Sequence, residues 1–210
     1  MVEFHIVNLR DFGKGSYRQI DDTPFGGGSG MVLMAEPLFK AIDHAMDLVS
    51  GPDNVRVIYP SPQGRIWNQD IAEETSQQEK LIVICGHYKG IDERVIEKYV
   101  THEYSLGDFV MTGGEIPAMV MLDSTVRLIP GTLNNLDSAL TDSFSQDLLD
   151  HPHYTHPREI DGMEVPEVLL GGYHAKIEAW RQEQKEKRTQ KKKPDLWKKF
   201  EKLKESEINH

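Results

Sequence analysis

Two short apolar runs that alternate with helical patterns constrain the fold of this chain most strongly. Residues 54–59 (NVRVIY) and 81–85 (LIVIC) are each long enough for one buried strand and too short for a helix. Residues 35–49 place apolar side chains at helical spacing, and 92–100 and 116–129 are also predicted helices. Because strands with continuous apolar runs are covered on both faces, we predict an α/β domain with a largely parallel sheet.

Other predicted elements lie around this pattern. Residues 2–9 (VEFHIVNL) are rich in β-branched and aromatic side chains, which predicts a strand, and Thr101–Ser105 is predicted as another. The segment SPQGR after Tyr59 is predicted as a turn, and Asn68 as the N-cap of a helix.

The C-terminal third has a different character. Residues 131–173 are rich in Asp, Ser, His, Pro and Gly, and two helices are predicted after them, at 173–187 and 195–204. The predicted organisation is therefore a sheet domain, an interdomain linker and a small helical domain, at residues 1–133, 134–149 and 150–210.

Composition excludes several classes of protein. Hydrophobic residues make up 38% and charged residues 28% of the 210 residues, which fits a globular protein rather than a disordered one. No segment approaches the length of a bilayer span, and the N-terminus does not resemble a signal peptide. The single cysteine, Cys85, cannot form an intrachain disulfide, so we expect a cytoplasmic protein with no membrane contact.

Charge is unevenly distributed along the chain. Residues 176–210 hold 12 basic and 7 acidic side chains, a net charge of +5, whereas the whole chain has a net charge of −10. A basic tail on an acidic body is typical of a surface that contacts a polyanion. A solvated helical face is the alternative interpretation.

Three turns are predicted at one edge of the sheet. Ser61–Gly64, Gly86–Gly90 and Leu106–Glu115 each follow a predicted strand. Ligands bind beyond the carboxyl ends of parallel strands, so the three turns together predict a nucleotide-like pocket, although each alone could be a simple tight turn. The run GGGSG fits neither a P-loop nor a dinucleotide-binding fingerprint.

The segment DSFSQDLLDHPHYTHP concentrates carboxylates and imidazoles. A protein-ligated metal, general acid–base chemistry by one carboxylate and a polar linker are all compatible with it, but its spacing matches no standard zinc pattern. The residues concerned are Asp142, Asp147, Asp150, His151, His153 and His156.

Seven motifs stand in order along the chain, namely IDDTPFGGGSGM, YPSPQGR, LIVICGHYKGIDERV, SLGDFVMTGGEIPAM, VRLIPG, DSFSQDLLDHPHYTHP and EVPEVLLGG. Together they make the sequence resemble a known family, the bacterial tRNA (guanine-N1)-methyltransferases of TrmD type, in the SPOUT class. The resemblance implies a deep trefoil knot, bound S-adenosylmethionine, and a homodimer in which both chains build each active site. It implies N1-methylation of the guanosine immediately 3′ of the tRNA anticodon, in a step that also depends on Mg²⁺.

The resemblance also implies residue roles. Asp142, in the linker, matches the family's proposed general base and Arg127 its catalytic arginine; a helix cap and a surface cation are the alternatives. A carboxylate on guanine N1–H can remove the proton as the methyl group arrives, and a guanidinium can stabilise charge growing on O6. The 150–210 segment matches the tRNA-binding domain. Residues that match the family's methyl-donor pocket are Pro60, Ser61, Pro62, Gln63, Gly86, Tyr88, Leu106, Gly107, Asp108, Phe109, Val110, Met111, Gly113, Gly114 and Pro117.

The sequence departs from the family pattern at several points. We expect the knotted domain to lack the family's first strand and helix, which would expose a sheet edge. Lys89 stands where the family often has Glu and could contact a tRNA phosphate. His156 replaces the usual Arg of a Tyr-Thr-Arg-Pro motif, and Gly171 and Tyr173 replace the common Ser and Asn.

Three other functions compete with this interpretation. A SPOUT methyltransferase for another RNA position is disfavoured by Asp142, because ribose methylation would not need that carboxylate. A catalytically impaired RNA-binding fragment is the second alternative. The third, a nucleotide hydrolase, is disfavoured because no Walker lysine follows the glycine-rich run.

Overall fold

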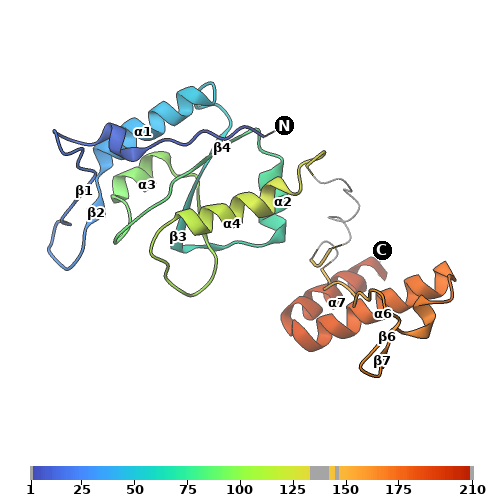
Figure 1. Cartoon of the computed structure of the whole chain (residues 1–210). Helices are drawn as coiled ribbons and strands as arrows, with labels where there is room; N and C mark the ends of the chain where they lie inside the picture. Colours follow the sequence, from blue (N-terminus) through green and yellow to red (C-terminus); the bar gives the residue numbers. More distant parts are fainter. Residues whose placement is uncertain (1, 133–141, 145–146, 209–210) are drawn as a thin grey trace. The chain divides into compact units, whose positions relative to one another are not determined.

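The computed structural model describes residues 2–132, 142–144 and 147–208 (Figure 1). The chain divides into two compact units, Met1–Asn134 and Asn135–His210. Much of the predicted linker, namely 134–141 and 145–146, lies outside the described residues. No helix in the described part of the chain is long and apolar enough to cross a membrane.

A three-stranded parallel sheet forms the centre of the first unit. Strand β3 (Val55–Ile66) lies between β4 (Lys80–Val83) and β5 (His102–Ser105). The predicted parallel arrangement of these strands is confirmed. The unit also holds a small antiparallel pair, β1 (Asp21–Asp22) and β2 (Val32–Leu33).

Helices cover both faces of the sheet because its strands are apolar on both sides. Val57 and Tyr59 of β3 pack in a cluster with Leu38 of α1 and Val95 of α3, whereas Ile58 packs in a second cluster on the opposite face. In that second cluster lie Ile71 of α2 and Met121 of α4. Helices α2 and α4 therefore lie on this face of the sheet (Figure 1). The helices are α1 (Ala35–Leu48), α2 (Gln69–Ser76), α3 (Glu93–Tyr99) and α4 (Glu115–Val126).

Helix starts follow the predicted capping chemistry. The Asn68 side chain accepts a hydrogen bond from the Ile71 N–H at 3.0 Å, which confirms it as the N-cap of α2. Asp92 caps α3 in the same way through the Arg94 N–H.

Two local predictions differ from the structure. The predicted strand at 2–9 is absent: Phe4 and Ile6 are exposed, and the described chain enters a 3-10 helix, η1 (Leu9–Phe12). A high strand propensity is not enough to form a strand here, because residues 2–9 pair with no strand of a sheet. The predicted turn at 61–64 is instead a bulge within β3, where pairing with β5 shifts between Pro60 and Arg65.

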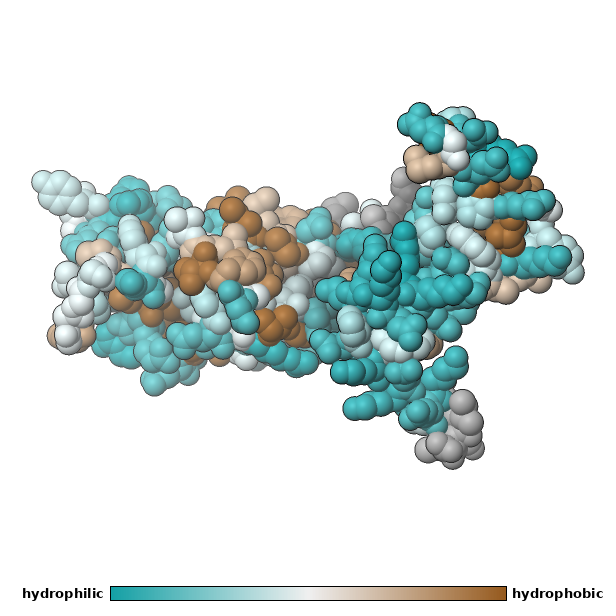
Figure 2. Space-filling view, turned by 90° about the horizontal axis from the view of Figure 1, so that it is seen from below, coloured by the Kyte–Doolittle hydropathy of each residue, from teal (hydrophilic) through white to brown (hydrophobic). Residues whose placement is uncertain are grey.

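Apolar side chains also remain on the surface of the first unit. Ile116, Met119 and Val120 of α4 have 59%, 67% and 45% of their surface exposed. Their spacing places them on one side of the helix. Brown patches on the first unit mark such apolar surface in the space-filling view (Figure 2).

The second unit is built on two helices that pack against each other, α6 (His174–Lys192) and α7 (Pro194–Ile208). Before them lie a short hairpin, β6 (Glu159–Ile160) and β7 (Met163–Glu164), and the 3-10 helix η2 (Glu167–Leu169). The two predicted C-terminal helices are therefore confirmed, with α6 longer than expected.

Candidate functional site

A cavity of about 670 Å³ lies at the carboxyl ends of the sheet strands. Ser61–Gln63 of the bulge, the turn after β4 and the segment after β5 all contribute to its wall. This is the edge of a parallel sheet at which ligands bind, and the volume lies within the range of small-molecule sites.

Two glycines let the loops approach each other closely. A Cβ added at Gly114 would lie 2.7 Å from the Gly86 nitrogen, and one at Gly64 would lie 2.4 Å from the Glu103 carbonyl carbon. The Gly114 N–H donates to the Gly86 carbonyl at 2.8 Å. The cavity wall is thus held by backbone contacts that a larger residue would break.

Most of the residues predicted for the methyl-donor pocket line this cavity. Gly107 and Asp108 do not; Ser105 Oγ bonds both the N–H and the C=O of Gly107 and holds that turn. The predicted residues that do line it are Pro60, Ser61, Pro62, Gln63, Gly86, Tyr88, Leu106, Phe109, Val110, Met111, Gly113, Gly114 and Pro117.

Several other lining residues were not among those matched to the methyl-donor pocket, although His87, Lys89, Gly90 and Thr112 belong to turns that were predicted to form it. Met31 follows the glycine-rich run, and its carbonyl accepts a hydrogen bond from the Lys89 N–H at 3.0 Å, so that run forms part of the wall. The GGGSGM motif is the sequence signal that could have identified Met31 as a lining residue. Further lining residues are Gly30, Tyr59, His87, Lys89, Gly90, Ile91, Glu93, Ile96, Tyr104, Ser105 and Thr112.

Cys85 lies next to the cavity and is not suited to nucleophilic catalysis. Burial, with a smaller contribution from Glu115, raises the pKa of its thiol to about 11. The thiol is therefore protonated at neutral pH, and only the thiolate is a strong nucleophile.

A pair of side chains joins the turn after β4 to the start of α4. His87 Nε2 lies 2.5 Å from Glu115 Oε1, and this hydrogen bond lowers the pKa of Glu115 against the opposing effect of burial. Because the pKa is depressed in the folded state, the stabilisation is present above the ordinary carboxyl pKa. It is lost as the pH falls through the lowered value.

We therefore expect Glu115→Gln to lower the melting temperature at neutral pH, by the equivalent of about 0–1 kcal/mol because both side chains are half-exposed. The difference from wild type should disappear in acid, below the lowered pKa of Glu115. Thermal unfolding across this pH range checks the prediction, and a difference that stays constant in acid would contradict it.

The two predicted catalytic residues lie in different units. Arg127 follows α4 in the first unit as its C-cap residue. Asp142 belongs to the second unit, where it lines a smaller cavity of about 250 Å³. The other lining residues of this smaller cavity are Asp150, His151, His153, Glu178, Arg181 and Lys185.

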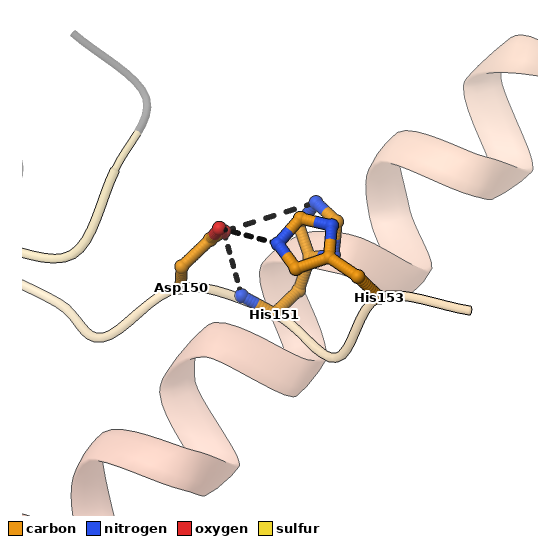
Figure 3. Close-up of side chains that lie close together, drawn as sticks. All are labelled: Asp150, His151 and His153. Carbon is orange, nitrogen blue, oxygen red and sulfur yellow. Dashed lines mark hydrogen bonds and ion pairs between the residues drawn. The ribbon is translucent and has the colours of Figure 1, made fainter. Parts of the chain in front are cut away.

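Asp150, His151 and His153 lie close together beside α6 (Figure 3). His153 Nε2 is 2.7 Å and His151 Nε2 is 3.8 Å from the Asp150 carboxylate. A metal ion here would face the ammonium of Lys185, which lies 3.9 Å from Asp150 Oδ1. Repulsion between the two cations favours an ion-pair cluster over a metal centre.

Comparison with known proteins identifies the family. A family model described as tRNA (Guanine-1)-methyltransferase TrmD matches residues 1–199. The chain belongs to the TrmD family. A relative from Brevibacillus brevis is 52% identical over 200 residues, which cover 95% of this chain and 81% of the relative. A relative from Clostridioides difficile is 47% identical over 199 residues, covering 95% and 86%. Both TrmD relatives are named tRNA (guanine-N(1)-)-methyltransferase.

Proposed function

We propose that this chain transfers a methyl group from S-adenosylmethionine to N1 of the guanosine immediately 3′ of the anticodon in tRNA. The observation that carries the proposal is the cavity at the strand ends, whose wall contains most of the matched donor-pocket residues in a chain of the TrmD family. Such an enzyme would act in the cytoplasm, where its two substrates occur.

The cavity suits S-adenosylmethionine in size and in chemistry. Leu106, Val110 and Met111 offer apolar surface, and the glycine-containing turns offer backbone N–H and C=O groups for a purine and an amino-acid end. When bound, S-adenosylmethionine supplies an electrophilic methyl group on a sulfonium.

The chain path near the cavity supports a trefoil knot. Strand β5 borders β3 on the side away from β4, yet Gly113 forms a bridge with His87, which follows β4. The segment after β5 therefore crosses the carboxyl end of β3. Such a crossing is needed to thread a knot, which is a rare exception among folds.

Asp142 and Arg127 would carry out the chemical step. The Asp142 carboxylate would take the N1 proton of guanine, which is a poor nucleophile while protonated. The Arg127 guanidinium would stabilise the negative charge that develops on O6. The rest of the rate enhancement would come from holding N1 in line with the methyl group.

The carboxylates of the described residues do not provide a Mg²⁺ site in the cavity. Glu93 is the one carboxylate among the described lining residues, and Mg²⁺ in proteins is usually held by carboxylates together with water or substrate oxygens. We therefore assign no protein ligands for Mg²⁺ and no step to it.

A homodimer would complete the active site. Helix α4 carries exposed apolar residues and also contributes Pro117 to the cavity wall, where Phe109 and Val110 are 56% and 84% exposed. Exposed apolar patches of this kind mark protein interfaces. A second copy of this chain docked there would cover the patch, and it could supply its own Asp142 to the cavity.

We expect Met119→Glu, on the exposed face of α4, to convert the dimer into monomers and to abolish methyl transfer, because a charge would then be buried at the interface. Light scattering after size-exclusion chromatography measures the mass. Leu48→Glu is the control, since Leu48 is an exposed apolar residue of α1 on the other face of the sheet. A dimeric Met119→Glu protein would contradict this interface.

The positive charge of the C-terminal helices is suited to binding the phosphates of tRNA. Residues 176–210 carry the net charge of +5 and include α7 and most of α6. Phosphate contacts by lysine and arginine supply most of the non-specific affinity for nucleic acids. The second unit is therefore our candidate tRNA-binding domain.

Methyl transfer from labelled S-adenosylmethionine to unmodified tRNA transcripts tests the proposal. One transcript has guanosine immediately 3′ of the anticodon, and its matched control has adenosine there. We expect label only in the first, as N1-methylguanosine. Label in both transcripts would indicate another RNA position, and no label with tRNA binding retained would indicate a binding protein.

A further inference from the structure

Hydrogen bonds join the described ends of the loop that follows Asp142, Ser143–Phe144 and Leu148–Asp150. Ser143 Oγ accepts from the Asp150 N–H at 2.9 Å, and the Phe144 N–H donates to the Leu148 carbonyl at 2.7 Å. Asp142 directly precedes this closed loop in the chain. Anchoring residues 148–150 therefore also restrains Ser143, the residue directly after Asp142.

Thr189 of α6 anchors the loop. Its Oγ1 accepts a hydrogen bond from the Leu149 N–H at 2.8 Å and donates one to the Lys185 carbonyl at 2.7 Å. The Thr189 side chain is completely buried, and the neighbouring Leu148 is 3% exposed. A hydroxyl can donate one hydrogen bond and also accept others. The Thr189 hydroxyl donates to the helix backbone, and its oxygen accepts from the loop.

The Asp150 cluster holds the end of the same loop. The Asp150 carboxylate bonds His153 (Figure 3). It also lies 3.9 Å from Lys185 Nζ. Lys185 and Thr189 are four residues apart and so lie on the same side of α6. The buried Thr189 contact and the more exposed Asp150 contact thus attach the loop to one stripe of the helix.

We propose that Thr189 is a positioning residue for methyl transfer, because its hydroxyl fixes the loop that places the Asp142 carboxylate. This inference rests on the proposed role of Asp142 as the base. Misplacing a reacting group by about 1 Å can cost roughly 100-fold in rate. Loss of the hydroxyl should therefore act on kcat and leave substrate binding unchanged.

Thr189→Val keeps the shape of the side chain and removes its hydrogen bonds. We expect kcat to fall by about 10- to 100-fold, with unchanged KM for S-adenosylmethionine and unchanged tRNA affinity in filter binding. Thr189→Ser retains the hydroxyl and should restore most of kcat. If the valine protein does not fold, Thr189→Ala removes the same hydroxyl and takes its place.

Thr75→Val is the matched control. Thr75 is also a buried helical threonine, 2% exposed, and it accepts a hydrogen bond from Arg56 Nη1 at 3.0 Å, far along the sequence from Asp142. It does not line the cavity. We expect this variant to lose thermal stability and to keep its kcat, which separates positioning from general destabilisation.

A double-mutant cycle with Asp142→Asn decides whether Thr189 acts through Asp142. In single-turnover assays, Thr189→Val should lower the rate of methyl transfer when Asp142 is present. It should lower the rate no further when Asp142 is already replaced by asparagine. An equal loss in both backgrounds, or an unchanged kcat for Thr189→Val, would overturn the inference. Absence of methyl transfer by the wild-type protein would instead overturn the proposed function itself.

Discussion

Replacing Asp142 with alanine should lower kcat for methyl transfer by roughly 10²–10⁴-fold, the usual contribution of a general base. Guanine N1 carries a proton at neutral pH, so without the carboxylate the methyl group would meet a nucleophile whose lone pair is not available. Because Asp142 is not among the residues that line the larger cavity and its proposed contact is with guanine, the affinity for S-adenosylmethionine should not change. Single-turnover kinetics and calorimetric titration measure the two quantities separately.

Asp161→Asn is the control for this substitution. It also removes one negative charge from the second unit, at an exposed turn between β6 and β7. Asp161 has a φ of +52°, a conformation that asparagine adopts readily, so the fold should be preserved. Full activity in Asp142→Ala, or an equal loss in Asp161→Asn, would remove Asp142 from the role of base.

The central sheet could be predicted because its apolar strands must be covered on both faces. Val57, Ile58 and Tyr59 are all apolar, so neither face of their strand could be left to water, and helices had to cover both. The segment at 2–9 carries an equally strong strand pattern, and yet it forms no strand. A strand needs a neighbour for its backbone, and no local pattern reveals whether one is present.

The bulge at Ser61–Gly64 shows another limit of local pattern. Pro60 and Pro62 lack an N–H, and with Gly64 they favour a turn. The chain instead resumes pairing with β5 at Arg65, because Gly64 can approach the backbone of Glu103. That approach depends on a partner about forty residues away in the sequence, which a propensity for turns does not include.

The sequence could predict those parts of the candidate site whose positions follow from the order and direction of the strands. Turns after neighbouring parallel strands must share one edge of the sheet, which is why the turns at Gly86 and Gly113 lie together. The conformation of Gly107, which does not line the cavity, depends instead on its two hydrogen bonds with Ser105 Oγ. The place of Asp142 relative to Arg127 depends on how separate units assemble, which no periodicity encodes.

Replacing Gly114 with alanine should weaken S-adenosylmethionine binding by about 10- to 100-fold, the equivalent of the 1–3 kcal/mol typical of overpacking. Gly114 has a φ of −82°, so alanine can adopt its backbone conformation, and space is the obstacle. The new Cβ would lie 2.7 Å from the Gly86 nitrogen and 2.8 Å from Cys85 Cα. Both are backbone atoms, which cannot rotate away, so the two loops must separate.

Separation of the loops would break the hydrogen bond from the Gly114 N–H to the Gly86 carbonyl and displace the residues that line the cavity. Calorimetric titration with S-adenosylmethionine measures the loss. Gly171→Ala is the control, because Gly171 has no heavy atom within 4 Å of an added Cβ and no positive φ. Wild-type affinity in Gly114→Ala would mean that the methyl donor binds elsewhere, whereas a loss confined to Gly114→Ala would support its binding against these loops.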